Sequence, residues 1–411
     1  MKKKIVSLVM AGLLVVSAIS GCGGSGGSAS SAAAGSSAAA GSSAAAGSGA
    51  AAGGSTIKIG SIGPVTGAAA LYGEAVKNGA QLAVDEINAA GGIGGSKIEF
   101  KFEDDEHDAE KSVNAYNTLK DWGMQILMGT VTTTPCIAVT EKTAADQMFQ
   151  LTPSASSQDV IAKDNVFQVC FTDPNQGIAS AKYIGTKKLA TKVAVLYNSS
   201  DVYSKGIYEK FMEESKNQSG TYTVVAEEAF TDESKTDFSA QLNKFKSAGA
   251  DLVFCPFYYE VAAVVLKQAN EIKFAPTFFG VDGMDGILGV ENFDTKLAEN
   301  VVLLTPFVAD AQDAKTQKFV EAYKKAYNNV TPIQFAADAY DAIYIIKEAA
   351  EKSGVKAGMK TDEICKLLKE AITGLSFDGL TGTGMKWSAD GAVNKDPKAM
   401  VIKNGAYTAM N

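Results

Sequence analysis

Two runs of hydroxyl side chains and one acidic turn are the residues of this sequence best suited to hold a ligand. The hydroxyl runs are Thr132–Thr134 and Ser154–Ser157, and the acidic turn is Gly280-Val281-Asp282-Gly283. Hydroxyls and backbone N–H groups at helix N-termini can hold a carboxylate, because the helix dipole is positive there. A single acidic side chain such as Asp282 then suits a single ammonium. The pattern is therefore of a kind that suits a small zwitterion.

Each of these features also has a purely structural interpretation. Runs of Thr and Ser are common as helix N-caps. An aspartate in a glycine-rich turn is favoured for backbone reasons alone. Tyr72 lies in another glycine-rich turn and can pack as a rim aromatic, while Tyr203 and Tyr258 follow expected strands and can be core residues. The residue types alone leave binding and structural roles open.

The composition excludes several other kinds of chemistry. The chain has 411 residues and a formal net charge of −8, and all of its 38 basic residues are lysines. Without arginine, no bidentate guanidinium is available for a carboxylate or a phosphate. His107 is the single histidine, so a zinc site with two histidine ligands is impossible. The negative charge argues against nucleic-acid binding, which needs a basic face.

Alternating strands and helices are expected to position the polar groups. Apolar and alternating runs predict strands in two series, the first at 57–62, 98–102, 125–129 and 148–151, the second at 193–197, 224–230, 251–256 and 277–281. Helical spacing predicts helices between them, including 109–121 with Asp108 as N-cap, 204–216, 238–247 and 260–272. Repeats of roughly 30 residues imply parallel sheets with helices on both faces. The expected fold class is α/β, with two doubly wound lobes.

The C-terminal part is expected to complete both lobes. It contains a strand at 300–306, three helices between Asp313 and Ala371, and hairpin-like segments around 385–387 and 399–403. The chain would then cross between the lobes about three times. Ligands of doubly wound sheets bind outside the carboxyl ends of the strands, which places the site in the cleft between the lobes.

The order of these motifs resembles a known family. Gly63-Pro64-Val65-Thr66-Gly67, followed by Tyr72-Gly73, precedes the hydroxyl run, Thr152-Pro153-Ser154-Ala155-Ser156 and Gly280-Val281-Asp282-Gly283. This series is similar to that of the branched-chain amino-acid-binding proteins of ABC importers, the leucine/isoleucine/valine class of type I periplasmic binding proteins. The resemblance covers residues 56–411 and rests on motif order. It implies a two-lobed fold with a multi-strand hinge, a small amino acid as ligand, an ABC permease as partner, and no catalysis.

The resemblance also implies a role for each site residue. Thr133 would hold the ligand carboxylate, and the Ser154 backbone with the Ser156 hydroxyl would bind the amino and carboxylate groups, with Ala155 between them. Asp282 would be the counter-ion of the ammonium. Tyr72 would line the side-chain pocket, and Tyr203 and Tyr258 would close over the ligand. Two positions depart from the family pattern, which often has Thr in place of Ser156 and Glu in place of Asp282. A shorter carboxylate can shift the amine or admit another ligand.

The N-terminus carries a sorting signal. Met1-Lys2-Lys3-Lys4 precedes a largely apolar region of 14 residues, Ile5 to Ala18. This region is shorter than the about 20 residues of a spanning helix and indicates a signal peptide. Ile19-Ser20-Gly21-Cys22 resembles a bacterial lipobox, which implies lipidation of Cys22 and an extracytoplasmic protein anchored to the cell membrane. Residues 23–55, almost entirely Gly, Ser and Ala, are expected to act as a flexible tether.

The remaining cysteines and acidic residues give no sign of a metal site or cofactor. Cys136, Cys170, Cys255 and Cys365 lack metal-ligand spacing and could form up to two disulfides, although Cys170 and Cys255 are expected to be buried free thiols. The acidic run around His107, 103–108, is interpreted as a solvated loop. Neither a dinucleotide-binding nor a P-loop motif is present, so no cofactor is expected.

These observations give one domain scheme and three functional hypotheses. The scheme is a lipoprotein signal peptide (1–21), a lipid-anchored tether (22–55), lobe 1 (56–171 with 306–378) and lobe 2 (172–305 with 379–411). The favoured hypothesis is a monomeric, lipid-anchored receptor for a small amino acid, leucine, isoleucine or valine first. The alternatives are a receptor for another polar solute, such as an amide, aromatic amino acid or short peptide, and an enzyme that uses Asp282 with His107 as acid and base.

Overall fold

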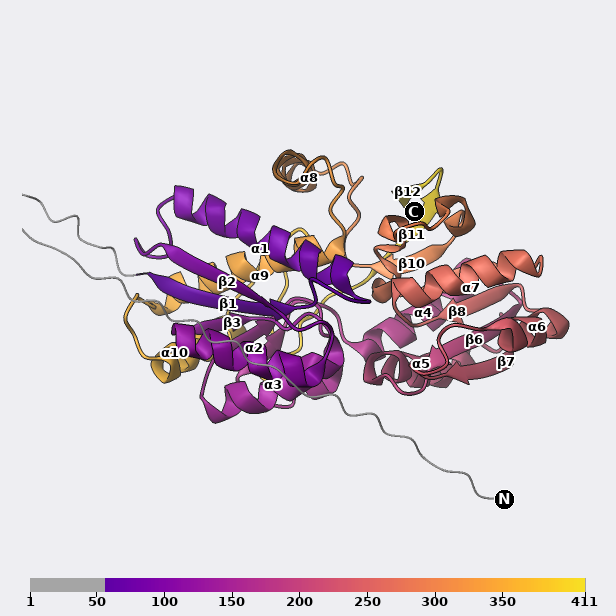
Figure 1. The fold of residues 1–411 in the computed structure, drawn as a ribbon, viewed down its shortest axis with the longest axis horizontal. Coiled ribbons are helices and arrows are strands. Elements are labelled where there is room, and N and C mark those ends of the chain that lie inside the picture. The colour runs from indigo at the N-terminus through magenta and orange to yellow at the C-terminus, as the bar shows by residue number, and fades with distance from the viewer. Residues whose placement is uncertain (1–55, 411) are drawn as a thin grey trace, which may run out of the picture. The chain divides into compact units, whose positions relative to one another are not determined.

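The computed structural model describes residues 56–410, and two β-sheets flanked by helices organise this part of the chain (Figure 1). The predicted signal peptide (1–21), the tether (22–55) and Cys22 lie outside the described residues. Within residues 56–410, none of the helices combines the length and apolar character needed to cross a membrane.

The first sheet is parallel throughout and has the order β2-β1-β3-β4-β5. Its strands are β1 (Ile57–Gly63), β2 (Ile98–Asp104), β3 (Ile126–Met128), β4 (Gln150–Thr152) and β5 (Val166–Gln168). Its helices are α1 (Ala70–Ala89), α2 (Ala109–Trp122), α3 (Thr133–Ala145), α9 (Gln334–Ser353) and α10 (Thr361–Thr373). The Asp108 side chain caps α2 by accepting a hydrogen bond from Lys111 N, as predicted.

The second sheet has the order β12-β11-β10-β9-β8-β6-β7. Its strands are β6 (Lys192–Asn198), β7 (Thr223–Phe230), β8 (Leu252–Cys255), β9 (Thr277–Gly280), β10 (Val302–Thr305), β11 (Lys398–Lys403) and β12 (Ala406–Ala409). The accompanying helices are α4 (Asp173–Lys187), α5 (Val202–Ser215), α6 (Ser239–Ala248) and α7 (Tyr259–Glu271), and α8 (Ala314–Ala326) follows β10. Only the β10–β11 and β11–β12 pairs are antiparallel among the described pairings of this sheet.

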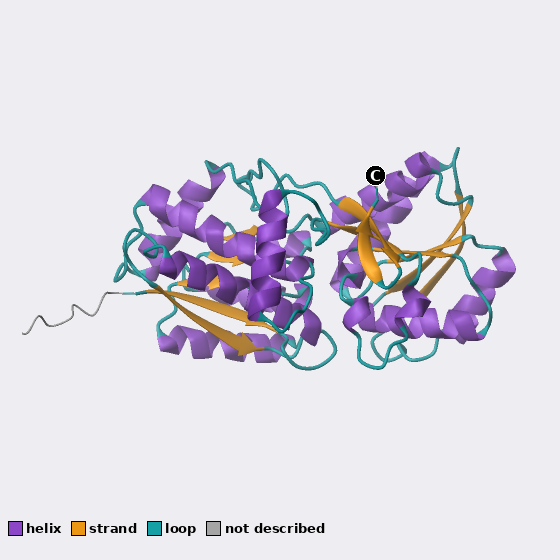
Figure 2. Cartoon of the chain, turned by 90° about the horizontal axis from the view of Figure 1, so that it is seen from above, coloured by secondary structure: helices purple, strands orange, loops and turns teal. Residues whose placement is uncertain are grey.

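Helices cover both faces of each sheet (Figure 2), so the α/β, doubly wound class predicted from the sequence is confirmed. The chain leaves the first sheet after β5, returns to it with α9 and α10, and ends in β11 and β12 of the second sheet. It therefore crosses between the two halves three times. A close approach holds the returning α9 against α1, because a Cβ added at Gly79 would lie 2.1 Å from the Ala336 carbonyl oxygen.

Short and irregular segments are where the structure differs from the sequence-based expectation. Strand β5 and helix α4 were not predicted, since β5 has only three residues and α4 contains Gly177 and Gly185, which weaken the helical signal. Residues 385–387 form isolated bridges rather than a hairpin ladder, with Phe377 paired to Met385 and Trp387 to Val393. Five short 3₁₀ turns complete the fold, namely η1 (Gln158–Ile161), η2 (Lys216–Gln218), η3 (Asp282–Met284), η4 (Ile287–Gly289) and η5 (Thr295–Ala298).

The segment before β11 lies against the first sheet. Trp387 Nε1 donates to the Gln168 carbonyl at 2.7 Å, and Gln168 N donates to the Gly391 carbonyl at 3.0 Å. The predicted lobe limits stay a proposal, and these contacts favour starting the last segment of lobe 2 nearer to Lys398 than to Gly379.

The four cysteines of the described chain are buried free thiols, which confirms the prediction for Cys170 and Cys255 and extends it to Cys136 and Cys365. Burial raises the pKa of Cys136 and of Cys365 to about 11, so neither thiol ionises readily near neutral pH.

Candidate functional site

Loops that follow strands of both sheets meet around one small cavity. Its volume is about 10 Å³, which is room for about one water molecule. The lining combines hydroxyl, acidic and aromatic side chains and consists of Tyr72, Val131, Thr132, Thr133, Ser154, Tyr203, Tyr258, Asp282, Gly283 and Phe335. Six of the eight residues predicted as ligand-binding therefore line a single cavity, and Ala155 and Ser156 are absent from the lining.

The hydroxyl side of the cavity is built at the start of α3. Thr132 has extended backbone torsions and makes no capping hydrogen bond, because its Oγ1 lies 2.9 Å from His107 Nδ1 instead. Pro135 in the first turn has no N–H group. The N-terminal end of α3, with Thr133 at its first position, is thus turned toward the cavity without a side-chain cap. This is an arrangement that suits an anionic group.

The loop after β4 is fastened to the loop after β3. Ser154 Oγ donates to the Val131 carbonyl at 2.7 Å, and Thr152 Oγ1 donates to the Thr130 carbonyl at 2.7 Å. The Ala155 carbonyl accepts from Gln168 Nε2 at 2.8 Å. Ser156 is fully buried, and its hydroxyl has no hydrogen-bond partner among the described residues. Ser154 therefore borders the cavity, whereas the ligand roles of Ala155 and Ser156 stay predictions.

The acidic side of the cavity is built at η3, directly after β9. Tyr203 of α5 donates its hydroxyl to Asp282 Oδ1 at 2.6 Å and accepts from Gly283 N at 2.9 Å. Asp282 is 4% exposed, and its burial raises the pKa of the carboxyl to about 7, although the Tyr203 hydroxyl pulls this pKa down. A ligand ammonium would favour the ionised carboxylate and lower its pKa. A bound cation would therefore stabilise the ionised form of the buried Asp282 carboxyl.

Aromatic rings form the rest of the wall. Tyr72 is fully buried, stacks on Phe335 with 4.1 Å between ring centroids, and packs edge-on against Tyr258 at 5.7 Å. Tyr203 and Tyr258 stack with centroids 4.8 Å apart. The Tyr72 hydroxyl donates to the Gly283 carbonyl. Since Tyr72 belongs to α1 and Gly283 follows β9, this hydrogen bond joins the two halves of the site.

The cavity is too small for an amino acid as it stands. Tyr72 and Tyr203 line the cavity, and both side chains are almost fully buried. Burial raises the pKa of both phenols well above the ordinary value, so they remain neutral donors. Entry of an amino acid therefore requires the aromatic side chains to turn away or the two halves to separate.

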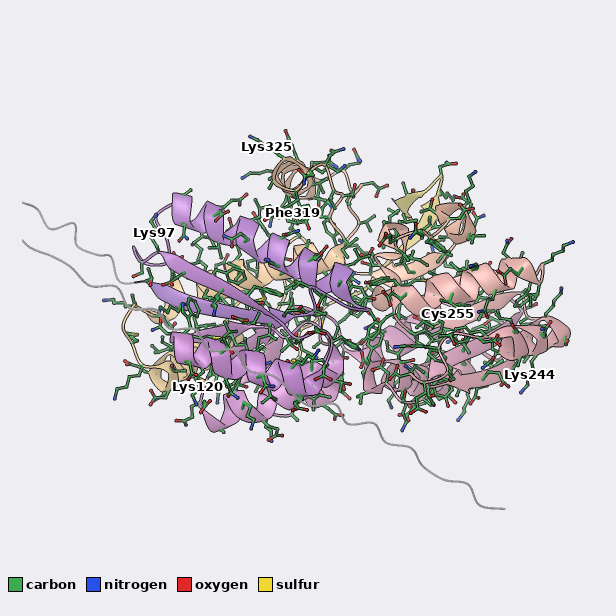
Figure 3. The ribbon with its side chains drawn as sticks, in the orientation of Figure 1. Lys97, Lys120, Lys244, Cys255, Phe319 and Lys325 are labelled. Carbon is green, nitrogen blue, oxygen red and sulfur yellow. The ribbon has the colours of Figure 1, made fainter. Side chains whose placement is uncertain are left out.

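None of the lining residues is basic. Figure 3 labels Lys97, Lys120, Lys244 and Lys325, which are exposed, and Phe319 and Cys255, which are buried. A ligand carboxylate at this cavity would thus be held by hydroxyl and N–H donors rather than by a cation. This lining agrees with the expectation, drawn from the absence of arginine, that no guanidinium would hold a ligand carboxylate.

The acid and base of the enzyme hypothesis lie in different surroundings. His107 contacts Thr132 and forms an edge-on ring contact with Tyr258 at 5.5 Å, and burial together with Lys235 lowers its pKa. Asp282 is engaged by Tyr203. No hydrogen bond joins His107 to Asp282 within residues 56–410. In the same range, no group of three or more His, Cys, Asp or Glu side chains is arranged to hold a metal ion.

Four lining residues were not assigned a ligand-binding role by the sequence reasoning. Thr132 stands in the predicted hydroxyl run, Val131 directly precedes it, and Gly283 stands next to Asp282, so their proximity was a usable signal. Phe335 was treated as ordinary helix structure. It comes from the start of α9, far along the chain, and its only sequence signal is its place at the first turn of a helix expected to return to the first lobe.

Comparisons with known proteins agree on one kind of molecule. A family model described as periplasmic binding protein matches residues 56–406. The chain is 31% identical over 333 residues to Leu/Ile/Val-binding protein homolog 3 of Brucella melitensis, covering 80% of this chain and 86% of that protein. It is 27% identical over 329 residues to the leucine-, isoleucine-, valine-, threonine- and alanine-binding protein of Pseudomonas aeruginosa, covering 80% and 84%.

A solved structure supports the same conclusion. The branched-chain amino acid transporter substrate-binding protein LivJ of Streptococcus pneumoniae, crystallised with isoleucine, superimposes with a TM-score of 0.77. It is 31% identical, and the match covers 86% of this chain and 98% of that one.

Proposed function

Because this chain belongs to the periplasmic binding protein family, we propose that it captures a small amino acid, leucine, isoleucine or valine first, and delivers it to an ABC importer. Members of this family are substrate-binding receptors rather than enzymes, and they act outside the cytoplasm. The Pseudomonas relative is named as binding leucine, isoleucine, valine, threonine and alanine, and LivJ was crystallised with isoleucine. The Brucella relative is named as a homologue of a Leu/Ile/Val-binding protein.

One observation carries the proposal. The uncapped start of α3 and the buried Asp282 face the same cavity from the two sheets. A carboxylate at the helix end and an ammonium at Asp282 would satisfy both groups of an amino acid at once. The side chain would then lie against the rings of Tyr72, Tyr258 and Phe335, which offer apolar surface. The binding roles of the eight predicted residues are part of this proposal.

Ligand capture is proposed to close two lobes, 56–171 with 306–378 and 172–305 with 379–411. The Tyr72–Gly283 hydrogen bond and the Tyr72–Tyr258 ring contact join elements on opposite sides of the cavity. A ligand that touches both sides favours the arrangement in which the sides meet. The permease would recognise that closed, monomeric form.

A thermal-shift panel with all twenty amino acids at about 1 mM tests the ligand. A micromolar ligand is then near 1,000 Kd and stabilises the protein by about 4 kcal/mol, which raises the melting temperature by roughly 5 °C for a folded part of this size. A rise with leucine, isoleucine or valine supports the proposal. A rise with another amino acid, an amide or a dipeptide only would replace the ligand, and no rise with any would overturn it.

Gly283→Ala should weaken amino-acid binding by about tenfold or more. A Cβ at this position would lie 2.5 Å from the Tyr203 hydroxyl and 3.0 Å from Tyr258 Cδ1, so Tyr203 would have to leave Asp282. A lost hydrogen bond to a charged group is worth about 1.5–3 kcal/mol. Calorimetric titration measures the change. Gly220→Ala is the matched control, because nothing lies within 4 Å of a Cβ there; equal affinity of both variants would contradict the assignment.

A lipid anchor at Cys22 is proposed from the lipobox resemblance alone. Expressed with its leader in a bacterial host, the protein should sediment with membranes and carry a diacylglyceryl mass increment. Cys22→Ser should remove that increment and release the protein into the extracytoplasmic fraction. Unchanged mass and fractionation of the Cys22→Ser variant would refute the anchor.

A further inference from the structure

The first turn of α4 contains buried polar groups that the site described so far does not use. Asp173 and Gln176 are 1% and 0% exposed. Both carboxyl oxygens of Asp173 and the Gln176 Nε2 atom have no hydrogen-bond partner among residues 56–410, and the same is true of Ser156 Oγ. A buried polar atom without a partner costs about 1–3 kcal/mol, so this cluster calls for a functional explanation.

This turn touches both sides of the ligand site. Asp173 N donates to the Ser156 carbonyl at 2.9 Å, which ties the turn to the loop after β4. Gln176 Oε1 accepts from Asp282 N at 3.3 Å, which ties it to η3. The same helical turn thus supports Ser156 on one side and Asp282 on the other.

A helix-dipole role alone does not explain Asp173. An acidic residue at a helix start is stabilising when it is exposed or capped, but here burial raises the carboxyl pKa well above its ordinary value. The Ser156 hydroxyl lies near enough to lower this pKa, although the two side chains do not form a hydrogen bond in the structure. On its other side the carboxyl faces Gly206 of α5, where an added Cβ would lie 3.4 Å from Oδ2. The Ser156 hydroxyl is therefore the neighbouring group with which the Asp173 carboxyl can form a hydrogen bond.

We propose that Asp173 is a positioning residue of the ligand site: in the ligand-bound protein its carboxyl accepts a hydrogen bond from the Ser156 hydroxyl, so that the Ser156 oxygen presents its lone pairs to the ligand ammonium. Asp282 and Ser156 then act as two acceptors for one ammonium. The site would in this way select a ligand with a free amino group over the matching 2-hydroxy acid. The inference rests on the proposed function.

A double-mutant cycle in leucine binding tests it. Asp173→Ala and Ser156→Ala should each weaken binding roughly 10- to 100-fold, and the double variant should lose little more than either single variant, because both remove the same interaction. Asp173→Asn keeps a carbonyl acceptor and should stay within about threefold of wild type. The preference for leucine over 2-hydroxyisocaproate should fall in Asp173→Ala, which a merely structural role would not cause.

The outcomes separate this inference from the proposed function. If the wild-type protein binds no amino acid, the proposed function and the inference fail together. If wild type binds leucine but the two single losses multiply in the double variant, or the amino-acid preference is unchanged, only the inference fails. Should Asp173→Ala not fold, the cycle is run with Asp173→Leu, which fills the buried volume and also removes the acceptor.

Discussion

Asp282→Asn should weaken amino-acid binding by at least about 30-fold, the largest effect expected of any single change in the cavity. Removal of one partner from a buried, hydrogen-bonded charge pair costs about 2–5 kcal/mol, and Asp282 is the acidic residue that lines the cavity. Tyr203 can still donate to the asparagine carbonyl, so the wall should keep its shape. Isothermal titration with the ligand found in the panel measures the loss.

The affinity of the wild-type protein should also depend on pH through the same group. Burial raises the pKa of Asp282 to about 7, and only the ionised form attracts an ammonium. Affinity should therefore be highest well above pH 7 and fall as the pH drops through 7, because the ligand must then displace a proton. Between pH 7.5 and 5.5 the expected loss is roughly 20-fold.

Two variants make the pH experiment specific. Asp282→Asn has no carboxyl at this position and should bind with nearly constant, weak affinity over the same range. Glu291→Gln removes an exposed acid and should behave as wild type. A pH dependence that persists in Asp282→Asn would point instead to Asp285, whose pKa burial also raises to about 7 and whose Oδ2 accepts from Gln334 N at 2.9 Å.

The polar half of the site could be predicted from the sequence, because its polar residues come directly after predicted strands. Thr133, Ser154 and Asp282 each follow a strand closely, and the carboxyl ends of parallel strands gather on one edge of a sheet. Thr133 and Ser154 follow strands of the first sheet and Asp282 follows a strand of the second, so the expected cleft between the lobes predicts that they meet. Phe335 escaped because it reaches the cavity from α9, and only the return of the chain to the first sheet brings it there.

The hydrogen-bond partners of the side chains in the site could not be predicted from residue type. Thr132 looked like a helix cap, but its hydroxyl contacts His107 across a loop that had appeared to be solvated. Ser156 is not among the residues that line the cavity, and its hydroxyl has no hydrogen-bond partner among residues 56–410, which its residue type could not show. Side-chain direction depends on tertiary packing, which sequence spacing does not contain.

The burial of Lys395 in the C-terminal segment could not be predicted from the sequence either. Lys395 belongs to a polar stretch, Asn394-Lys395-Asp396, of a kind that is typical of exposed segments. In the structure it is 6% exposed, and its Nζ donates to Asp338 Oδ1 at 2.7 Å, to Thr381 Oγ1 at 2.7 Å and to the Val169 carbonyl at 2.9 Å. These three acceptors join α9, the segment before β11 and the end of β5.

Lys395→Met should destabilise the protein by about 3–5 kcal/mol at pH 8, which corresponds to a fall in melting temperature of roughly 4–7 °C. Methionine keeps most of the apolar stem but leaves Asp338, which is 1% exposed, without its cation. Lys386→Met is the control, because Lys386 is exposed in the same segment and its loss should change the melting temperature little.

The destabilisation should depend on pH with a defined sign. Burial raises the pKa of Asp338 to about 6 in the wild-type protein, even though Lys395 lowers it. Loss of the lysine raises this pKa further. Below pH 6 the Asp338 carboxyl is neutral in both folded proteins. Above pH 6 it ionises in the wild-type protein, where Lys395 stabilises the charge, but not in the variant. The difference in unfolding free energy should therefore grow between pH 6 and 8, by up to about 3 kcal/mol.

The double variant Asp338→Asn/Lys395→Met separates the buried charge from the lost packing. It has no carboxyl to neutralise, so its stability relative to wild type should not fall further as the pH rises from 6 to 8, and it should recover about 2 kcal/mol of the single-variant loss at pH 8. A double variant as unstable as Lys395→Met throughout would show that the hydrogen bonds to Val169 and Thr381, rather than the charge of Asp338, decide the stability of this junction.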